Sequence, residues 1–229
     1  MYQLYIANKN YSSWSLRPWI LMTELSIDFE ERLQVFESDN NYTAFRQFSP
    51  SGTVPCLSDG DMTVWDSLAI AEYLAEHHSG VWPSDPVARA FARCAAAEMH
   101  SSFGTLRGNC PMNCAIRVDM KVISPSLQKD LDRIDELWRE GLERFGGAFL
   151  AGDRFTAVDA FYCPVAFRLQ SYQLPMSAES LAYAHRLLAL PGMQAWYQAG
   201  IQEPWQEAAH EAEAAQAGKI IADLRDQNA

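Results

Sequence analysis

The sequence predicts an α/β unit over residues 1–78 followed by an all-helical unit over residues 87–229. Short apolar runs alternate with helical patterns in the first unit, whereas apolar residues recur at helical spacing through most of the second. Between the units, residues 79–86 contain one glycine and two prolines without periodicity, which is typical of a linker.

The first unit has the order strand, helix, strand, helix, strand, strand, helix. We expect these elements at residues 2–7, 14–25, 31–36, 41–48, 54–58, 62–65 and 67–78. Pro18 falls in the first turn of the first helix, where a missing N–H is tolerated. Asp59-Gly60 favours a hairpin between the last two strands. The order predicts a mixed four-stranded sheet with helices packed against it.

The second unit begins with two long helical patterns. Their apolar residues follow three- and four-residue steps: Phe91, Ala95, Met99, Phe103 and Leu106 in one, and Leu127, Leu131, Ile134, Leu137 and Leu142 in the other. Gly146-Gly147 ends the second helix. Further helices are expected at about 157–171 and 179–189, and shorter ones after Gly192 and Pro204. A helical bundle is therefore predicted.

Composition excludes several classes of function. The chain of 229 residues has 18 basic and 29 acidic side chains, a net charge of −11, which argues against binding nucleic acid or an anionic membrane. No apolar run approaches the roughly 20 residues of a membrane span, and the N-terminus does not read as a secretory signal. Five cysteines, without histidines at metal-ligand spacing, favour a cytoplasmic protein with reduced thiols and no metal.

Two hydroxyls stand at the start of the first helix, those of Ser12 and Ser13. Such hydroxyls most often cap helices. They could instead donate to a bound thiolate, which the positive end of the helix would also favour.

Two further segments also allow a structural and a functional interpretation. A proline at a strand start, as in Val54-Pro55, is usually an edge feature, but a cis bond there would present the Val54 backbone to a peptide-like ligand. Asp66-Ser67 opens the helix at 67–78. Asp66 can be a plain N-cap, or the helix start can bind an anion with the carboxylate near a ligand ammonium.

The order and spacing of these segments resemble the soluble glutathione transferases over nearly the whole chain. The segments are SSWSLRPW at 12–19, SGTVPCL at 51–57, WDSLAI at 65–70 and FLAGDRFTAVDA at 149–160. The resemblance implies a thioredoxin-like N-terminal domain and an all-helical C-terminal domain. The last segment looks like the family's capping box, with Thr156 as N-cap and Asp159 at N3. Ser-Ser-Trp followed by Arg17 is similar to the serine-type classes, most of all the zeta class, in an atypical, bacterial-like form.

The resemblance also implies roles for individual residues. Ser12 or Ser13 would donate a hydrogen bond to the glutathione sulfur. Ser12 is the preferred candidate, because its position, five residues before Arg17, corresponds to the cysteine of cysteine-type relatives. Val54 would pair with the cysteinyl backbone of glutathione, and Pro55 would be cis.

The remaining contacts would hold the two ends of the tripeptide. Ser67 would bind the γ-glutamyl carboxylate and Asp66 would lie near its ammonium. Thr53 stands where many members have a lysine or glutamine for the glycyl carboxylate, so that contact is open. The zeta-class Ser-Ser-Cys run is absent, which puts a zeta-type substrate in doubt.

A pocket for the second substrate is expected between the domains, against the first helix of the bundle. Its candidate residues are Tyr11, Trp14, His100, Phe103 and Arg107. For each of them a core or solvated role is also possible.

The implied function is a glutathione S-transferase, a homodimer that directs the glutathione thiolate at a small hydrophobic electrophile. Two alternatives remain: a glutathione-dependent cis–trans isomerase of the maleylacetoacetate isomerase type, and a non-catalytic binding protein with the same fold. The joint presence of Ser12, Val54-Pro55 and Asp66-Ser67 disfavours the non-catalytic protein.

Overall fold

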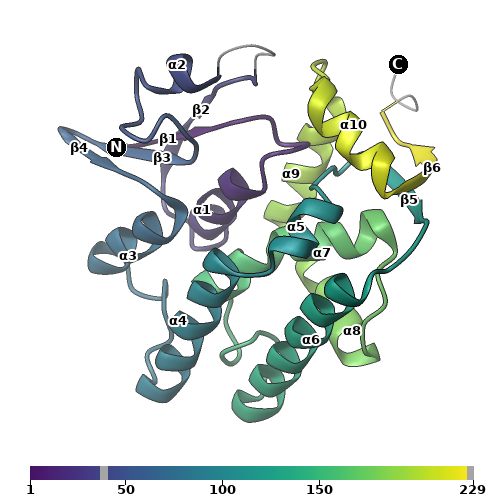
Figure 1. Ribbon diagram of the computed structural model, residues 1–229. Coiled ribbons are helices and arrows are strands. Elements are labelled where there is room, and N and C mark those ends of the chain that lie inside the picture. Colours follow the sequence, from purple (N-terminus) through teal and green to yellow (C-terminus); the bar gives the residue numbers. More distant parts are fainter. Residues whose placement is uncertain (37–40, 226–229) are drawn as a thin grey trace.

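The computed structural model describes residues 1–36 and 41–225 (Figure 1). Residues 37–40 and 226–229, which belong to the two expected domains, lie outside the described part. The first half contains β1 (Tyr2–Ile6), α1 (Ser13–Glu24), β2 (Phe29–Leu33), α2 (Asn41–Phe45), β3 (Cys56–Asp59), β4 (Met62–Val64) and α3 (Ser67–His77). The second contains α4 (Pro86–Ser101), α5 (Gly104–Asn109), β5 (Ile116–Met120), α6 (Pro125–Phe145), α7 (Ala157–Tyr172), α8 (Ala178–Leu188), α9 (Pro191–Gln202), α10 (Ala208–Ala217) and β6 (Gly218–Asp223).

The first sheet is mixed and four-stranded, as predicted, and its strand order is β2-β1-β3-β4. β1 runs parallel to β2 and antiparallel to β3, and Leu4 lies opposite Leu57 in the core. The predicted hairpin joins β3 and β4, with Gly60 at φ +58° in its turn. β2 covers 29–33 and not the expected 31–36, because it pairs residue by residue with the five residues of β1.

Helix α1 lies at the centre of the molecule, between the first sheet and α7 (Figure 1). The sequence predicted Pro18 in the first turn of this helix. Because the helix begins at Ser13, Pro18 falls in the second turn instead. Pro18 has no N–H for the carbonyl of Trp14, one turn earlier. Most of α1 is buried, which fixes the position of its N-terminal end.

The second half is mainly helical, and its core continues into that of the first half. α7 packs against α1, α4 and α8, and is buried along nearly its whole length. The predicted capping box is confirmed: Asp159 accepts a hydrogen bond from the Thr156 backbone N–H at 2.9 Å. Gly146 ends α6 with φ +65°, where glycine has no steric penalty.

The second half is not purely helical. β5 and β6 form an antiparallel pair in which Ile116 lies opposite Asp223. β5 alternates buried and more exposed residues, and its partner lies about 100 residues later in the chain. Figure 1 shows this pair and α10 together at one side of the molecule.

The first helix of the second half is shorter than its apolar spacing suggests. α4 ends at Ser101, and Phe103 adopts φ +58° before α5 begins at Gly104. The expected helix through Leu106 is therefore broken into two. Within the described residues, no helix combines the length and apolar character that a membrane crossing needs.

Candidate active site

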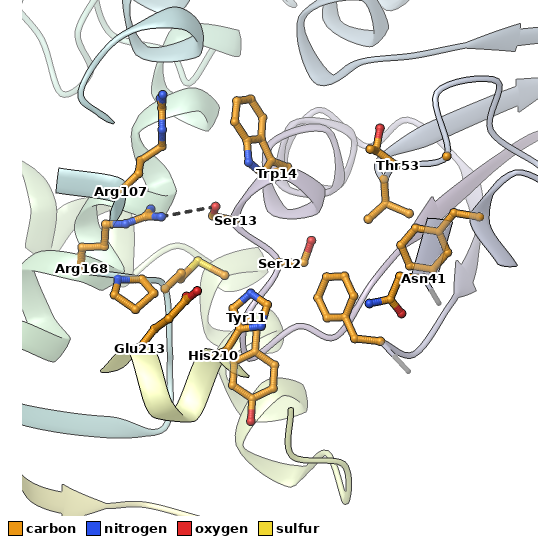
Figure 2. A pocket seen from close by; sticks show the side chains of 16 residues that line it. Tyr11, Ser12, Ser13, Trp14, Asn41, Thr53, Arg107, Arg168, His210 and Glu213 are labelled. Atoms are coloured by element: carbon orange, nitrogen blue, oxygen red, sulfur yellow. Dashed lines mark hydrogen bonds between the residues drawn. The ribbon is translucent and has the colours of Figure 1, made fainter. Parts of the chain in front are cut away.

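A pocket of about 440 Å³ opens at the N-terminal end of α1 (Figure 2). It is lined by Tyr11, Ser12, Ser13, Trp14, Phe36, Asn41, Phe45, Gly52, Thr53, Val54, Arg107, Pro111, Met112, Arg168, His210 and Glu213. Seven of the residues singled out in the sequence are therefore brought together here: Tyr11, Ser12, Ser13, Trp14, Thr53, Val54 and Arg107.

The two serines use their hydroxyls differently. Ser12 is the N-cap of α1, but its side chain makes no capping bond. Its Oγ donates instead to Ser15 Oγ at 2.7 Å, and Ser15 Oγ also accepts from the Ala7 backbone N–H at 3.1 Å. Ser13 Oγ accepts from Arg168 Nη2 at 3.4 Å. Ser13 therefore keeps its own hydroxyl hydrogen for an acceptor in the pocket.

Arg168 is a site residue that the sequence analysis missed. It projects from α7, is 3% exposed, and donates to the backbone carbonyls of Cys110 at 2.8 Å and Pro164 at 3.2 Å. Burial lowers its pKa to about 10, so it stays charged at neutral pH. The sequence does single out Arg168 in one way: it is the only charged residue between positions 160 and 178, and a charged side chain is rarely buried without a partner.

The segment before β3 forms the opposite wall. The Val54–Pro55 peptide bond is cis. Pro55 itself is buried and does not line the pocket, whereas Val54 and Thr53 do. Gly52 has φ +67°, and a Cβ there would come within 2.5 Å of the Tyr42 ring. Glycine is therefore required where this wall turns towards the pocket.

Asp66 and Ser67 lie at the start of α3, outside the pocket lining. Asp66 is the N-cap and accepts from the Leu68 backbone N–H at 3.0 Å. Its Oδ2 also lies 3.2 Å from His100 Nε2. Ser67 is fully buried, and its Oγ accepts a long hydrogen bond of 3.5 Å from Arg17 Nη1.

Two residues expected in the wall of the pocket do not line it. His100 points to Asp66, and its ring meets the edge of Trp14 at 5.4 Å between ring centres. Phe103 is buried in the core at the break between α4 and α5. The wall contributed by the second half therefore comes from α5, the segment after it, α7 and α10, and not from α4 as expected.

Of the three wall residues expected from the second half, Arg107 does line the pocket. Its Nη1 donates to the Met99 carbonyl at 3.1 Å, and its guanidinium lies 5.6 Å from the centre of the Trp14 ring. Partial burial lowers its pKa. The Arg107 guanidinium therefore lies beside the Trp14 ring.

Arg17 is a second arginine near the Trp14 ring. It is 1% exposed, and its guanidinium lies 4.1 Å from the Trp14 ring centre and 4.9 Å from that of Phe161. Burial and, after it, the charges of Arg168 and Arg107 lower its pKa to about 9. Both neighbouring cations thus add to the electrostatic cost of the Arg17 charge.

Helix α10 closes one side of the pocket. The His210 ring lies 5.2 Å from Tyr11 and 5.5 Å from Phe36, measured between ring centres. Tyr11 Oη donates to Glu211 Oε1 at 2.6 Å. The alanine- and acid-rich composition of this segment gave no signal for such a role. Among the described residues, no group of histidine, cysteine or carboxylate side chains could hold a metal ion.

Two family models match the chain. The N-terminal domain model of glutathione S-transferases matches residues 11–77, and the C-terminal domain model matches residues 120–199. A glutathione transferase homolog from Burkholderia GL BGR1, solved with bound glutathione, has a TM-score of 0.65 and 24% identity. That match covers 86% of this chain and 96% of the homolog.

Two curated relatives carry different activities in their names. A dichloromethane dehalogenase of Methylophilus leisingeri is 42% identical over 59 residues, 25% of this chain and 22% of the relative. The chain therefore spans about a fifth of the dehalogenase's length. A probable maleylacetoacetate isomerase of Caenorhabditis elegans is 23% identical over 180 residues, 76% of this chain and 81% of the relative.

The two family models follow each other along the chain and together cover more than half of it. The mixed sheet and the helical second half agree with that order. The chain belongs to the glutathione S-transferase family.

Proposed function

We propose that the protein is a glutathione transferase that activates the glutathione thiol at the N-terminal end of α1. The observation that carries this proposal is that the Ser12 and Ser13 side chains line one pocket together with Thr53 and Val54. Figure 2 shows the serines between Thr53 on one side and Arg168 on the other. A tripeptide along the Thr53–Val54 wall would place its thiol beside the serines.

The tripeptide would be held mainly through its backbone and its two ends. The N–H and C=O of Val54, beside the cis Val54–Pro55 bond, would pair with the cysteinyl residue. The γ-glutamyl group would reach the start of α3, where Ser67 and the helix N-terminus favour its carboxylate and Asp66 its ammonium. Thr53 would lie near the glycyl end.

Ser13 is the better thiolate donor of the two serines. The Ser12 hydroxyl already donates to Ser15, whereas Ser13 accepts from the charged Arg168 and can donate its own hydrogen. A free thiol has a pKa of about 8.5 and is mostly protonated at neutral pH. A hydrogen bond to the thiolate, together with a nearby guanidinium, lowers that pKa. The resulting thiolate attacks an electrophilic carbon of the second substrate.

The proposal includes a cytoplasmic homodimer. The five free cysteines are typical of a reducing compartment. Met62, Trp65 and Val87 expose large apolar side chains, which a second copy would cover.

The test is calorimetry with glutathione, followed by conjugation of a chlorinated nitroarene. We expect glutathione binding and glutathione-dependent release of chloride. Absence of glutathione binding by the folded protein would overturn the proposal. Light scattering at several protein concentrations tests the dimer separately.

Glutathione-dependent cis–trans isomerisation is a second candidate function. It is supported by the match to the probable maleylacetoacetate isomerase over most of both chains. The same thiolate would add to a double bond and leave after rotation, so the two functions differ only in the substrate. A cis-diketo acid assayed beside the nitroarene separates them: isomerisation without conjugation would favour the second candidate.

A further inference from the structure

The half of the pocket that faces away from Thr53 and Val54 is positively charged. Arg107 comes from α5 and Arg168 from α7, and both line it. Figure 2 shows the two arginines on one side of the serines, and Thr53 and Asn41 on the other. If glutathione lies along Thr53 and Val54, as proposed above, the arginines face the second substrate.

Neither arginine has its charge neutralised by an ion pair among the described residues. Arg168 donates to the carbonyls of Cys110 and Pro164 and to the Ser13 hydroxyl, all of which are uncharged. Arg107 donates to the carbonyl of Met99. These bonds satisfy part of the donor capacity of each guanidinium but leave its charge in place.

Nearby carboxylates are few. The Asp130 carboxylate attracts the Arg107 charge but forms no ion pair with it. Its Oδ2 instead accepts a hydrogen bond from the Leu106 backbone N–H at 2.9 Å. Glu213 is the only carboxylate in the described lining, and it is exposed on α10. An exposed carboxylate is screened by solvent and offsets little of the buried charge.

Arg17 adds to the positive potential from behind the Trp14 ring. Its guanidinium stacks on that ring at 4.1 Å, and its Nε has no hydrogen-bond partner among the described residues. The chain as a whole is acidic, with a net charge of −11, so the sign of the charge at this site is opposite to that of the whole protein. Clefts lined by charge of one sign attract ligands of the opposite sign.

We propose that the second substrate carries a carboxylate, which Arg107 binds in the pocket. This proposal rests on the glutathione transferase function and specifies its substrate class. A guanidinium can hold a carboxylate through two parallel hydrogen bonds, and Arg107 has N–H groups beyond the one given to Met99. Arg168 and Arg17 add long-range attraction. The expectation from the sequence was a small hydrophobic electrophile, and the arginines specify one that is also anionic.

A matched substrate pair tests the proposal: 4-chloro-3,5-dinitrobenzoate and its methyl ester. In both, the glutathione sulfur bonds to the ring carbon, the carbon–chlorine bond breaks, chloride leaves, and the thiol proton passes to solvent. Each kcat/KM is divided by the rate constant of the uncatalysed reaction with glutathione, because the ester activates the ring more strongly. We expect the corrected acid-to-ester ratio to exceed about tenfold in the unmodified protein.

Three variants assign the preference to Arg107. Arg107→Met should lower the acid-to-ester ratio by about tenfold, and Arg107→Lys should keep part of it because the charge remains. Arg93→Met is the matched control: Arg93 pairs with Glu72 on the surface and lies outside the pocket. Its ratio should equal that of the unmodified protein.

The outcomes separate the two proposals. An unmodified protein that binds glutathione but shows no acid preference overturns the anionic substrate, as does an unchanged ratio in Arg107→Met. If neither compound reacts, calorimetry in the presence of S-methylglutathione compares 3,5-dinitrobenzoate with its methyl ester, and equal affinities overturn it as well. Absence of glutathione binding overturns the transferase function itself.

Discussion

The Arg168 guanidinium donates a hydrogen bond of 3.4 Å to the Ser13 hydroxyl, across 155 positions of the sequence. This bond links α7 to the first residue of α1. It orients the Ser13 oxygen towards the cation and leaves the hydroxyl hydrogen for the pocket. A charged donor also polarises the hydroxyl, which makes it a stronger donor to a thiolate.

Ser13→Ala should therefore raise the pKa of the enzyme-bound glutathione thiol by about one to two units. At neutral pH this lowers the thiolate fraction, and with it kcat/KM, by about 10- to 100-fold. Ser12→Ala is the matched control and should change the thiol pKa less, because the Ser12 hydroxyl already donates to Ser15. Thiolate absorbance measured against pH gives the pKa. A larger shift in Ser12→Ala than in Ser13→Ala would restore the order expected from the sequence.

Arg168→Met tests the cation as a positioning residue. The bound thiol should have a pKa about one unit higher than in the unmodified protein, and Arg168→Lys should recover part of the difference. In the Ser13→Ala background, Arg168→Met should raise the pKa less, since its effect acts partly through that hydroxyl. A lower rate at every pH with an unchanged thiol pKa would assign Arg168 a purely structural role.

The sequence predicted the local features well. The hairpin at Gly60, the end of α6 at Gly146 and the capping box of Thr156 and Asp159 all depend on residues that are close in the chain. Each rests on backbone preferences or hydrogen bonds that neighbouring side chains decide. The mixed sheet followed from the order of such elements.

The missed features depend on contacts between distant segments. β5 has an alternating pattern, but its partner β6 lies in an alanine- and acid-rich tail, so the pairing has no local signal. Arg168 was visible as a lone charge in an apolar helix, but the sequence does not show that it reaches Ser13. For the same reason the sequence predicts pocket residues on α4, whereas the helices of the second half that line the pocket are α5, α7 and α10.

Asp159→Ala should destabilise the fold by about 2–4 kcal/mol. The fully buried carboxylate accepts hydrogen bonds from the Leu150 backbone N–H at 3.0 Å, the Thr156 backbone N–H at 2.9 Å and Tyr183 Oη at 2.7 Å. Removing it leaves these donors unpaired inside the core. Denaturant unfolding measures the free energy of unfolding. The control is Asp132→Ala at an exposed position, which should lower it by less than about 0.5 kcal/mol. Equal losses in the two variants would contradict this role of the capping box.

Glu211 holds α10 against the start of α1 and against the segment that follows β6. Its carboxylate accepts from Tyr11 Oη at 2.6 Å, from Arg225 Nη1 at 2.6 Å and from Asn113 Nδ2 at 3.1 Å. Burial by itself raises the pKa of Glu211, but the hydrogen bonds from Arg225 and Tyr11 outweigh it and hold the pKa below its usual value. The folded protein thus binds this proton less readily than the unfolded chain does. Its stabilising contribution is complete above the ordinary glutamate pKa of about 4.3 and is lost as the pH falls through the lower folded-state pKa.

Glu211→Gln should accordingly lower the free energy of unfolding by about 1–3 kcal/mol at neutral pH. The difference from the unmodified protein should shrink as the pH falls below about 4, because Glu211 itself then becomes neutral. Glu213→Gln, an exposed change on the same helix, should have little effect at either pH. Denaturant unfolding at a series of pH values measures all three proteins. A Glu211→Gln difference that stays constant down to the acid end of the series would show that the charge of Glu211 does not fasten the helix.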